Sequence, residues 1–237
     1  MNNHRFRLGC LVFLSTIGMV GCDSVKAAFD DILSQQEYIG MPKPSEGFAI
    51  ENCTLTYNGQ VLDYSKPIEQ WERVLGAARP ASPSSKRQVW DEHGLRVSTR
   101  NENGAPSSLT FFFYKYMPYS EKDIAAAYGD QSKTLKRHIN EAKPKNVFTS
   151  SIWFNGAEIS AHWDLNKVNG QMAHYNENNK NWLQEAYAPT IFVANKRCNL
   201  KNYPDYRNKE MIFRIDVEQH DRSLVQVFTV GLSLEDL

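Results

Sequence analysis

This sequence of 237 residues lacks an excess of either charge, because it carries 27 basic and 27 acidic side chains. A partner such as nucleic acid, which attracts strongly basic proteins, is therefore not indicated. Disorder is also disfavoured, because 41% of the residues are apolar and 12% are aromatic. The chain is long enough to bury one large core or two small ones.

The short motifs of several common enzyme classes are missing as well. No Gly-x-Ser-x-Gly elbow, no His-Glu-x-x-His motif and no glycine-rich phosphate loop occurs. His162 and Asp164 stand two apart, as two metal ligands on one strand face would, but no further ligand follows at a recognisable spacing. We therefore expect a protein that is not an enzyme and that holds no metal or other cofactor. A divergent hydrolase is the alternative, and it would depend on Ser65, His93 or His162.

The N-terminus carries a short apolar run of the kind found in export signals. Leu8–Val20 is too short to cross a bilayer comfortably, it follows the basic residues Arg5 and Arg7, and small residues precede Cys22. This pattern predicts a signal peptide over residues 1–21. Its removal takes Arg5 and Arg7 from the 27 basic residues, which leaves 25 against 27 acidic ones and a mature chain close to neutral.

The end of this signal resembles a bacterial lipobox. In the sequence Met19-Val20-Gly21-Cys22 the cysteine would become the lipidated first residue of the mature protein, and two or three acyl chains are enough for stable anchoring. An ordinary signal peptide is the alternative. We expect a palmitate-bearing lipoprotein that faces the periplasm, with residues 22–47 as a tether. Asp23 resembles an inner-membrane retention signal and slightly favours that membrane over the outer one.

Cysteine is scarce, and each of the four cysteines has a predicted place. Cys10 leaves with the signal peptide and Cys22 carries lipid, so Cys53 and Cys198 remain as a possible disulfide in a compartment that permits one. Such a bridge would close a loop of about 145 residues and stabilise the fold by about 4–5 kcal/mol. Alternatively, Cys53 is a small buried apolar residue on the same strand face as Leu55.

The segment Phe48–Gly76 contains the clearest fold signals. Alternation over Cys53–Tyr57 and Gln60–Tyr64, interrupted by Asn58-Gly59, predicts a β-hairpin with a two-residue turn. The following segment, Pro67–Gly76, has a proline at its start, apolar residues at helical spacing and a glycine at its end, which predicts a short amphipathic helix.

The same pattern recurs about 97 residues later in Ile152–Ser160, around Asn155-Gly156. We therefore predict two tandem repeats over 48–117 and 147–237, joined by a connector over 118–146. Each repeat is expected to form an antiparallel sheet with a short helix on one face, which makes the fold class α+β. Two unrelated Asn-Gly hairpins are the alternative.

An aromatic run, Phe111–Tyr116, stands near the end of the first repeat. Alternate strand residues face opposite ways, so this run cannot point into a single sheet face. Either both faces are covered within the protein, or one aromatic row is offered to a partner. The packing of two repeats together favours internal covering.

Several predicted loops combine aromatic, asparagine and arginine side chains, which suit protein contacts. Ordinary solvated loops are the alternative for most of them. The residues selected as partner-binding candidates are Arg79, Arg87, Arg100, Tyr114, Tyr116, His174, Tyr175, Trp182, Tyr203 and Tyr206.

The lipobox and the tandem unit together resemble a known class of protein. The segments that carry the likeness are Tyr57–Gly59, Ser65–Trp71, Val74–Gly76 and Val89–Val97. With these, the chain resembles bacterial immunity lipoproteins paired with phospholipase effectors of type VI secretion systems. The resemblance implies a tethered inhibitor that binds a toxic effector and blocks its active site or its access to lipid. An envelope-assembly or ligand-binding lipoprotein is the alternative.

Overall fold

The computed structural model describes residues 39–82, 85–100, 104–114, 129, 132–175, 183–186, 190–199 and 207–232. These residues belong to one compact unit, residues 38–237. The predicted signal peptide and the lipidation residue Cys22 lie outside the described residues. In the part of the chain that the structure describes, no helix is both long and apolar enough to span a membrane.

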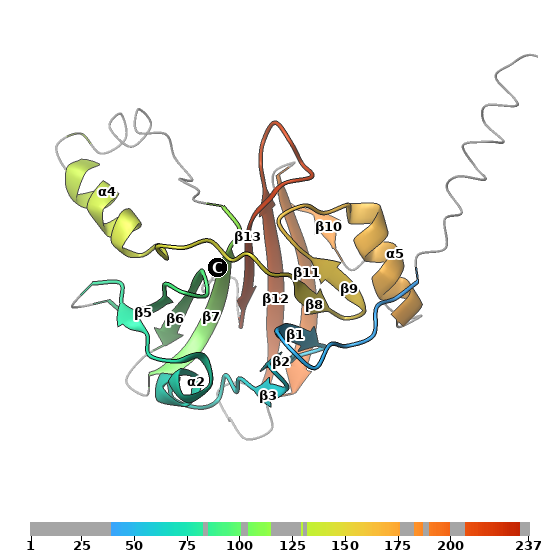
Figure 1. The fold of residues 1–237 in the computed structure, drawn as a ribbon, viewed down its shortest axis with the longest axis horizontal. Helices are drawn as coiled ribbons and strands as arrows, with labels where there is room; N and C mark the ends of the chain where they lie inside the picture. The colour runs from blue at the N-terminus through green and yellow to red at the C-terminus, as the bar shows by residue number, and fades with distance from the viewer. Residues whose placement is uncertain are drawn as a thin grey trace, which may run out of the picture. The chain divides into compact units, whose positions relative to one another are not determined.

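The described elements follow one another in an order that is similar in the two repeats (Figure 1). The strands are β1 Phe48–Glu51, β2 Thr54–Tyr57, β3 Gln60–Val61, β4 Arg79–Pro80, β5 Arg87–Trp90, β6 Leu95–Arg100, β7 Ala105–Phe112, β8 Ile152–Phe154, β9 Ala157–Ile159, β10 Gln184–Glu185, β11 Ile191–Asn199, β12 Arg207–Val217 and β13 Val225–Gly231. The helices are α2 Ile68–Leu75, α4 Ser132–Glu141 and α5 Leu165–Tyr175.

These strands form two sheets. The hairpin sheet has five strands in the order β3-β2-β1-β8-β9, and the meander sheet has eight in the order β10-β11-β12-β13-β7-β6-β5-β4. Every described pair of neighbours is antiparallel except β1 with β8. The predicted α+β class, with antiparallel sheets and short helices, is confirmed.

The distribution of the strands differs from the prediction of one sheet for each repeat. The hairpins β2–β3 and β8–β9 lie on either side of β1 in the hairpin sheet, while β4–β7 and β10–β13 are two halves of the meander sheet. The halves join through β7 and β13, the last strand of each, so the order is approximately two-fold symmetric about this pair. A lone half would leave the buried strand β7 as an open edge, and pairing with the other half removes that edge.

Both hairpins turn as their Asn-Gly pairs predict. Asn58 and Gly59 have φ of 48° and 74°, and Asn155 and Gly156 have φ of 47° and 91°. A tight two-residue hairpin turn of this type needs positive φ at both central residues, which asparagine and glycine adopt at the lowest cost.

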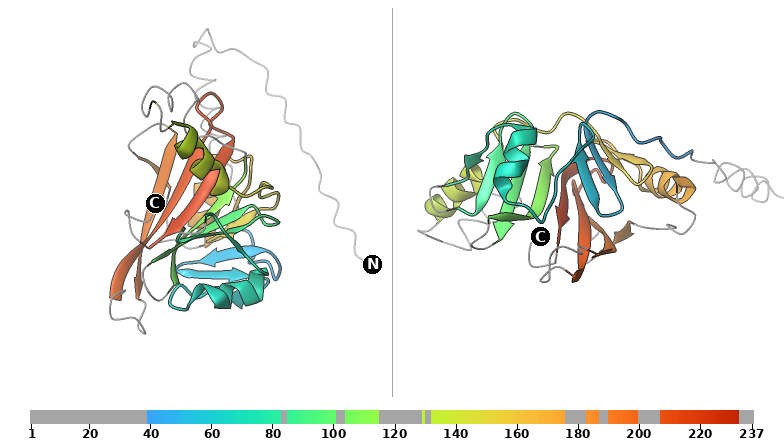
Figure 2. Two further views of the ribbon diagram at one scale, coloured as in Figure 1. Left: turned by 90° about the vertical axis from the view of Figure 1, so that its left-hand side faces the viewer. Right: turned by 90° about the horizontal axis from the view of Figure 1, so that it is seen from below.

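The core lies between the two sheets and under α2. Phe111 of β7 stacks on Phe228 of β13 with ring centroids 6.0 Å apart, and it meets Phe48 of β1 edge-on at 5.0 Å. Trp71 of α2 is fully buried and donates its indole N–H to the Asp63 carbonyl. Figure 2 shows α2 along the strands of the first repeat and α5 beside the hairpin of the second.

The aromatic run of the first repeat is covered on both sides. Phe111, Phe112 and Phe113 are 0%, 6% and 3% exposed, although successive residues of a strand face opposite ways. Internal covering is therefore confirmed for these three residues. The exposed part of the run begins at Tyr114, which is 42% exposed, and Tyr116 lies outside the described residues.

Candidate functional site

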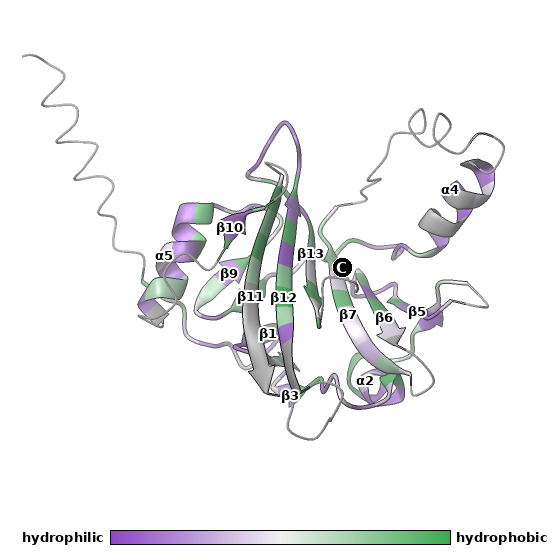
Figure 3. Cartoon of the chain, turned by 180° about the vertical axis from the view of Figure 1, so that it is seen from behind, coloured by the Kyte–Doolittle hydropathy of each residue, from purple (hydrophilic) through white to green (hydrophobic). Residues whose placement is uncertain are grey.

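Charged side chains gather on the outer face of the meander sheet, which is the face turned away from the hairpin sheet. On β6, Leu95 and Val97 are fully buried in the core, so Arg96 between them points to the outer face. The register places Arg96 beside Val89 of β5 and Thr110 of β7. Figure 3 shows the same alternation on β12, which is banded in hydrophilic and hydrophobic colour along its length.

Arg96 is largely enclosed although it lies on this outer face. Its guanidinium carbon lies 5.1 Å from the centroid of the Phe112 ring, within the range of a cation–π contact. Its Nε is buried and has no hydrogen-bond partner. Burial lowers the pKa of Arg96 to about 10, and the positive charge of Arg87 adds to this effect. A buried donor of a charged group without an acceptor is costly, so this position favours an anion.

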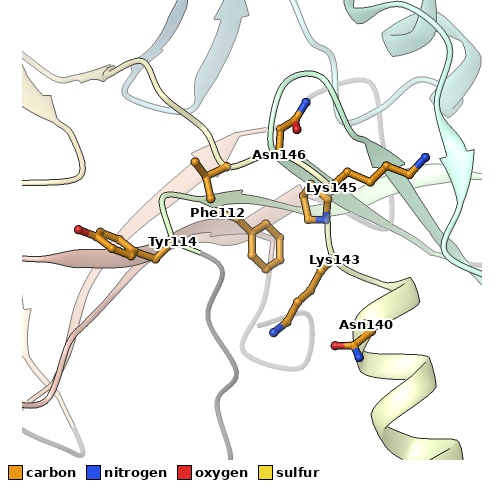
Figure 4. Close-up of a pocket in the computed structure, with 8 residues that line it drawn as sticks. Phe112, Tyr114, Asn140, Lys143, Lys145 and Asn146 are labelled. Carbon is orange, nitrogen blue, oxygen red and sulfur yellow. The ribbon is translucent and has the colours of Figure 1, made fainter.

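A second cation approaches Arg96 from the segment that follows α4. Burial lowers the pKa of the Lys143 ammonium, and the positive charge of Arg96 lowers it further. Lys143, Phe112 and Tyr114 line a hollow of about 270 Å³ together with Asn140, Pro144, Lys145, Asn146 and Val147. Figure 4 shows the Lys143 side chain on the Phe112 side of this segment, with Lys145 turned away.

Arg79 of β4 fixes the segment that carries Lys143. Its Nε and Nη2 donate to the two Asp91 carboxylate oxygens at 2.6 and 3.0 Å, while Nη1 and Nη2 donate to the carbonyls of Glu141 and Lys143, each at 2.8 Å. Asp91 also accepts the Lys145 backbone N–H at 2.8 Å. The hydrogen bond from Arg79, more than any other cause, lowers the pKa of Asp91.

A second hollow, of about 590 Å³, borders Arg79 and Asp91 next to this segment. Polar side chains at its rim are bonded to the backbone. The His93 Nε2 lies 3.0 Å from the Leu75 carbonyl, and the Trp90 indole N–H donates to the Gly76 carbonyl at 2.7 Å. These contacts join the turn after β5 to the end of α2, which is a structural role.

The predicted partner-binding residues fall in different places. Tyr114 lines the smaller hollow. Exposed Arg87 lies on the same outer face as Arg96, because it is two residues before Val89 on β5 and Val89 pairs with Arg96. The Arg79 guanidinium is bonded within the chain, and exposed His174 belongs to α5 in the other repeat.

Some of these predictions fall on side chains that the structure does not describe. Arg100 lies in β6 and Tyr175 in α5, but their side chains are outside the described part. The other candidates outside the described residues are Tyr116, Trp182, Tyr203 and Tyr206.

Sequence reasoning missed Arg96 and Lys143. In a strand with alternating apolar residues, Arg96 has the pattern of an ordinary solvated side chain, and Lys143 lies in a charged stretch of the connector. Only the packing of the 140–147 segment over β6 and β7 encloses them. One sequence signal could have found Arg96. Alignment of the two repeats would have shown that Leu95–Ser98 is similar to Phe213–Asp216.

The remaining predicted site residues that the structure describes lie at different positions in the fold and do not form one site. Cys53 is disulfide-bonded, and the side chain of its predicted partner Cys198 lies outside the described residues. Buried Ser65 lies before α2, and exposed His162 forms an isolated bridge with Leu224. No group of three or more His, Cys, Asp or Glu residues suited to a metal ion lies within the described ranges.

Comparison with known proteins gives one match. A family model with the description "Domain of unknown function (DUF7738)" matches residues 47–169, which is more than half of the chain. The matched segment includes β1–β7, α4 and the second hairpin, and it ends within α5. Searches of curated proteins and of solved structures found no match.

Proposed function

The chain belongs to the DUF7738 family, and we propose that it is a membrane-tethered periplasmic immunity protein. In this proposal it binds and neutralises a toxic effector, a phospholipase delivered by a type VI secretion system. The observation that most directly supports a binding role is the outer face of the first repeat. There, the enclosed cation Arg96 lies beside a hollow lined by Lys143 and the exposed ring of Tyr114.

An inhibitor of this kind needs a rigid surface rather than chemistry of its own. Strands β5, β6 and β7 provide hydrogen-bonded support for the face. Arg79 holds the covering segment through two hydrogen bonds to its carbonyls and is itself held by two hydrogen bonds to Asp91. A binding surface that is already ordered loses little conformational entropy when a partner binds. A standard interface of roughly 1,600 Å² in total would extend from this face to neighbouring loops.

The charge of the face also suits an inhibitor that must act quickly. Arg87, Arg96 and Lys143 combine into a positive region on a chain that is close to neutral as a whole. Complementary charge raises association rates and selects partners more than it raises affinity. The lipid predicted on Cys22 would hold this region close to the membrane that a phospholipase attacks.

Co-expression tests the proposal. The toxin candidate encoded beside this gene is produced in the periplasm of a sensitive cell, with and without the lipoprotein, and the two proteins are purified together. We expect survival only with the lipoprotein, a one-to-one complex, and loss of phospholipase activity on a fluorogenic lipid at equimolar inhibitor.

Absence of both protection and complex formation for every neighbouring toxic protein would overturn the immunity proposal. Envelope defects on depletion of the lipoprotein, without any toxin present, would instead support the envelope-assembly alternative. A catalytically inactive toxin variant serves as the control for growth effects that do not depend on lipid hydrolysis.

A further inference from the structure

The two repeats allow a comparison within the molecule. Arg96 on β6 pairs with Thr110 on β7, Arg214 on β12 pairs with Thr229 on β13, and the two threonines pair with each other at the centre of the meander sheet. The approximate two-fold symmetry of this sheet therefore makes Arg96 and Arg214 equivalent. Their sequences agree, since Leu95-Arg96-Val97-Ser98 corresponds to Phe213-Arg214-Ile215-Asp216.

In the second repeat the arginine has its own carboxylate. Arg214 Nε donates to Asp216 Oδ1 at 2.7 Å and Nη2 donates to Oδ2 at 3.1 Å, which is a bidentate pair between residues i and i+2 on one strand face. In the first repeat the i+2 residue is Ser98 instead of an aspartate. The Nε of Arg96 is left buried and without a hydrogen-bond partner.

Within the part of the chain that the structure describes, the charges around Arg96 do not replace that missing acid. The register sets exposed Arg87 directly across from Ser98, and Lys143 approaches from the covering segment. Asp91, which directly follows β5, is engaged by the Arg79 guanidinium and by the backbone N–H of Lys145. Arg96 is thus an enclosed cation with other cations beside it.

We propose that the position left by Ser98 receives an aspartate or glutamate side chain of the partner protein, which pairs with Arg96 as Asp216 pairs with Arg214. This inference rests on the proposed function and names the chemical group of the effector that the inhibitor recognises. A carboxylate is favoured over other anions because the equivalent site of the second repeat already holds one.

The substitution Ser98→Asp tests the inference by filling the site from within. It gives the first repeat the carboxylate that the second repeat has, so Arg96 would be paired before the effector arrives. We expect at least about 30-fold weaker effector binding in calorimetric titration, which corresponds to the lower end of the loss when one partner of an enclosed charge pair is removed. Ser98→Asn adds similar volume without charge and should bind within a few-fold of wild type.

A second variant tests the geometry of the pair. Arg96→Lys keeps the positive charge but removes the fork that binds both carboxylate oxygens. We expect it to weaken effector binding about tenfold or more, while the equivalent Arg214→Lys leaves binding unchanged. A folded Ser98→Asp and a folded Arg96→Lys that both bind the effector as wild type does would overturn the inference and leave the proposed function intact.

A measurement without the effector separates the two proposals. The arginine Nε–H signals of the mature protein in detergent are followed by ¹⁵N nuclear magnetic resonance during titration with acetate, after assignment with Arg96→Lys and Arg214→Lys. We expect a saturable shift of the Arg96 signal, no shift of the Arg214 signal, and loss of the response in Ser98→Asp.

Each result of that titration has a definite meaning. An acetate response at Arg96 in a protein that binds no toxin would support the carboxylate site and count against the immunity role. A saturable response to inorganic phosphate but not to acetate would overturn the carboxylate assignment. No saturable response to acetate, together with unchanged effector binding by Ser98→Asp, would overturn the site itself.

Discussion

At the scale of single residues, Arg79 connects three parts of the chain. Its guanidinium joins β4 to Asp91 after β5 and to the carbonyls of Glu141 and Lys143 after α4. The segment that covers the outer face is therefore held in part by a side chain that the sequence had predicted to be a partner contact.

Replacing Arg79 is expected to destabilise the fold. Arg79→Ala removes charge-assisted hydrogen bonds and should lower the free energy of unfolding by about 2 kcal/mol. Larger values are not expected, because the Arg79 side chain is partly exposed to solvent. Arg87→Ala, at an exposed arginine of the next strand, should change it by less than about 0.5 kcal/mol. Urea unfolding of both variants measures the difference. Equal stability of the two would contradict the assigned role of Arg79.

Asp91 is expected to make the fold sensitive to acid. Its pKa is lowered in the folded state, chiefly by the hydrogen bond from Arg79, relative to about 3.9 in the unfolded chain. The ionised carboxylate therefore stabilises the fold fully above the unfolded pKa, and this contribution is lost as pH falls through the folded pKa.

Asp91→Asn should accordingly lose less stability than wild type between about pH 5 and pH 2. Unfolding midpoints in urea across this range provide the measurement, and Glu92→Gln at the exposed neighbouring position is the control. Parallel loss of stability in wild type and Asp91→Asn would show that other carboxylates dominate acid unfolding.

At the scale of elements, the turn between β5 and β6 is tied to the chain that leads to β8. Gly94 has a φ of 66°, and a Cβ there would overlap the backbone of Val147 and Phe148. The Phe148 N–H donates to the Phe112 carbonyl, so the backbone at Gly94 lies against a segment that is itself anchored to β7. Only a residue without a side chain allows this approach.

Gly94→Ala should therefore cost about 3–5 kcal/mol, from left-handed strain together with a clash against backbone that cannot rotate away. Gly104→Ala is the matched control, because its φ is 63° but its added Cβ would meet nothing within 4 Å. We expect about 1 kcal/mol for the control. Thermal and urea unfolding of the two variants would reveal whether the clash or only the strain matters.

At the scale of the whole molecule, the disulfide of Cys53 lies at the turn between β1 and β2 of the hairpin sheet. The predicted partner, Cys198, belongs to β11 of the meander sheet. This pairing would tie the two sheets together and close a loop of about 145 residues.

Loss of that bridge should lower the free energy of unfolding by about 4–5 kcal/mol in the chain-entropy description. Unfolding of the double variant Cys53→Ser/Cys198→Ser tests the magnitude, and peptide mass mapping of the unreduced protein tests the pairing. A peptide that joins Cys53 to any cysteine other than Cys198 would show the predicted pairing to be wrong.

The tether is also a property of the whole chain. Cys22→Ser should abolish palmitate labelling and release the protein from the membrane fraction, because the acyl chains on this cysteine are the predicted anchor. The fold itself should unfold at the same urea concentration as wild type. Retention of the variant in the membrane fraction after a salt wash would contradict the lipoprotein prediction.

Local signals in the sequence were sufficient for the elements whose geometry is local. The Asn-Gly turns and the helix α2 with its terminal glycine follow from spacing and turn chemistry within a few residues. The recurrence of the hairpin also predicted the repeat. Such features depend on neighbours in the chain, so a single sequence contains them.

The tertiary structure alone decided how the repeats share their strands and which charge is enclosed. Strand β1, only four residues long, became the centre of the hairpin sheet by pairing with β8 about a hundred residues away. The meander halves joined at β7 and β13, and the 140–147 segment closed over Arg96. These contacts form between residues that are distant in the sequence. The alternation of apolar and polar residues is the same whether each repeat forms its own sheet or the repeats share two sheets, so only the packing of the folded chain distinguishes the two arrangements.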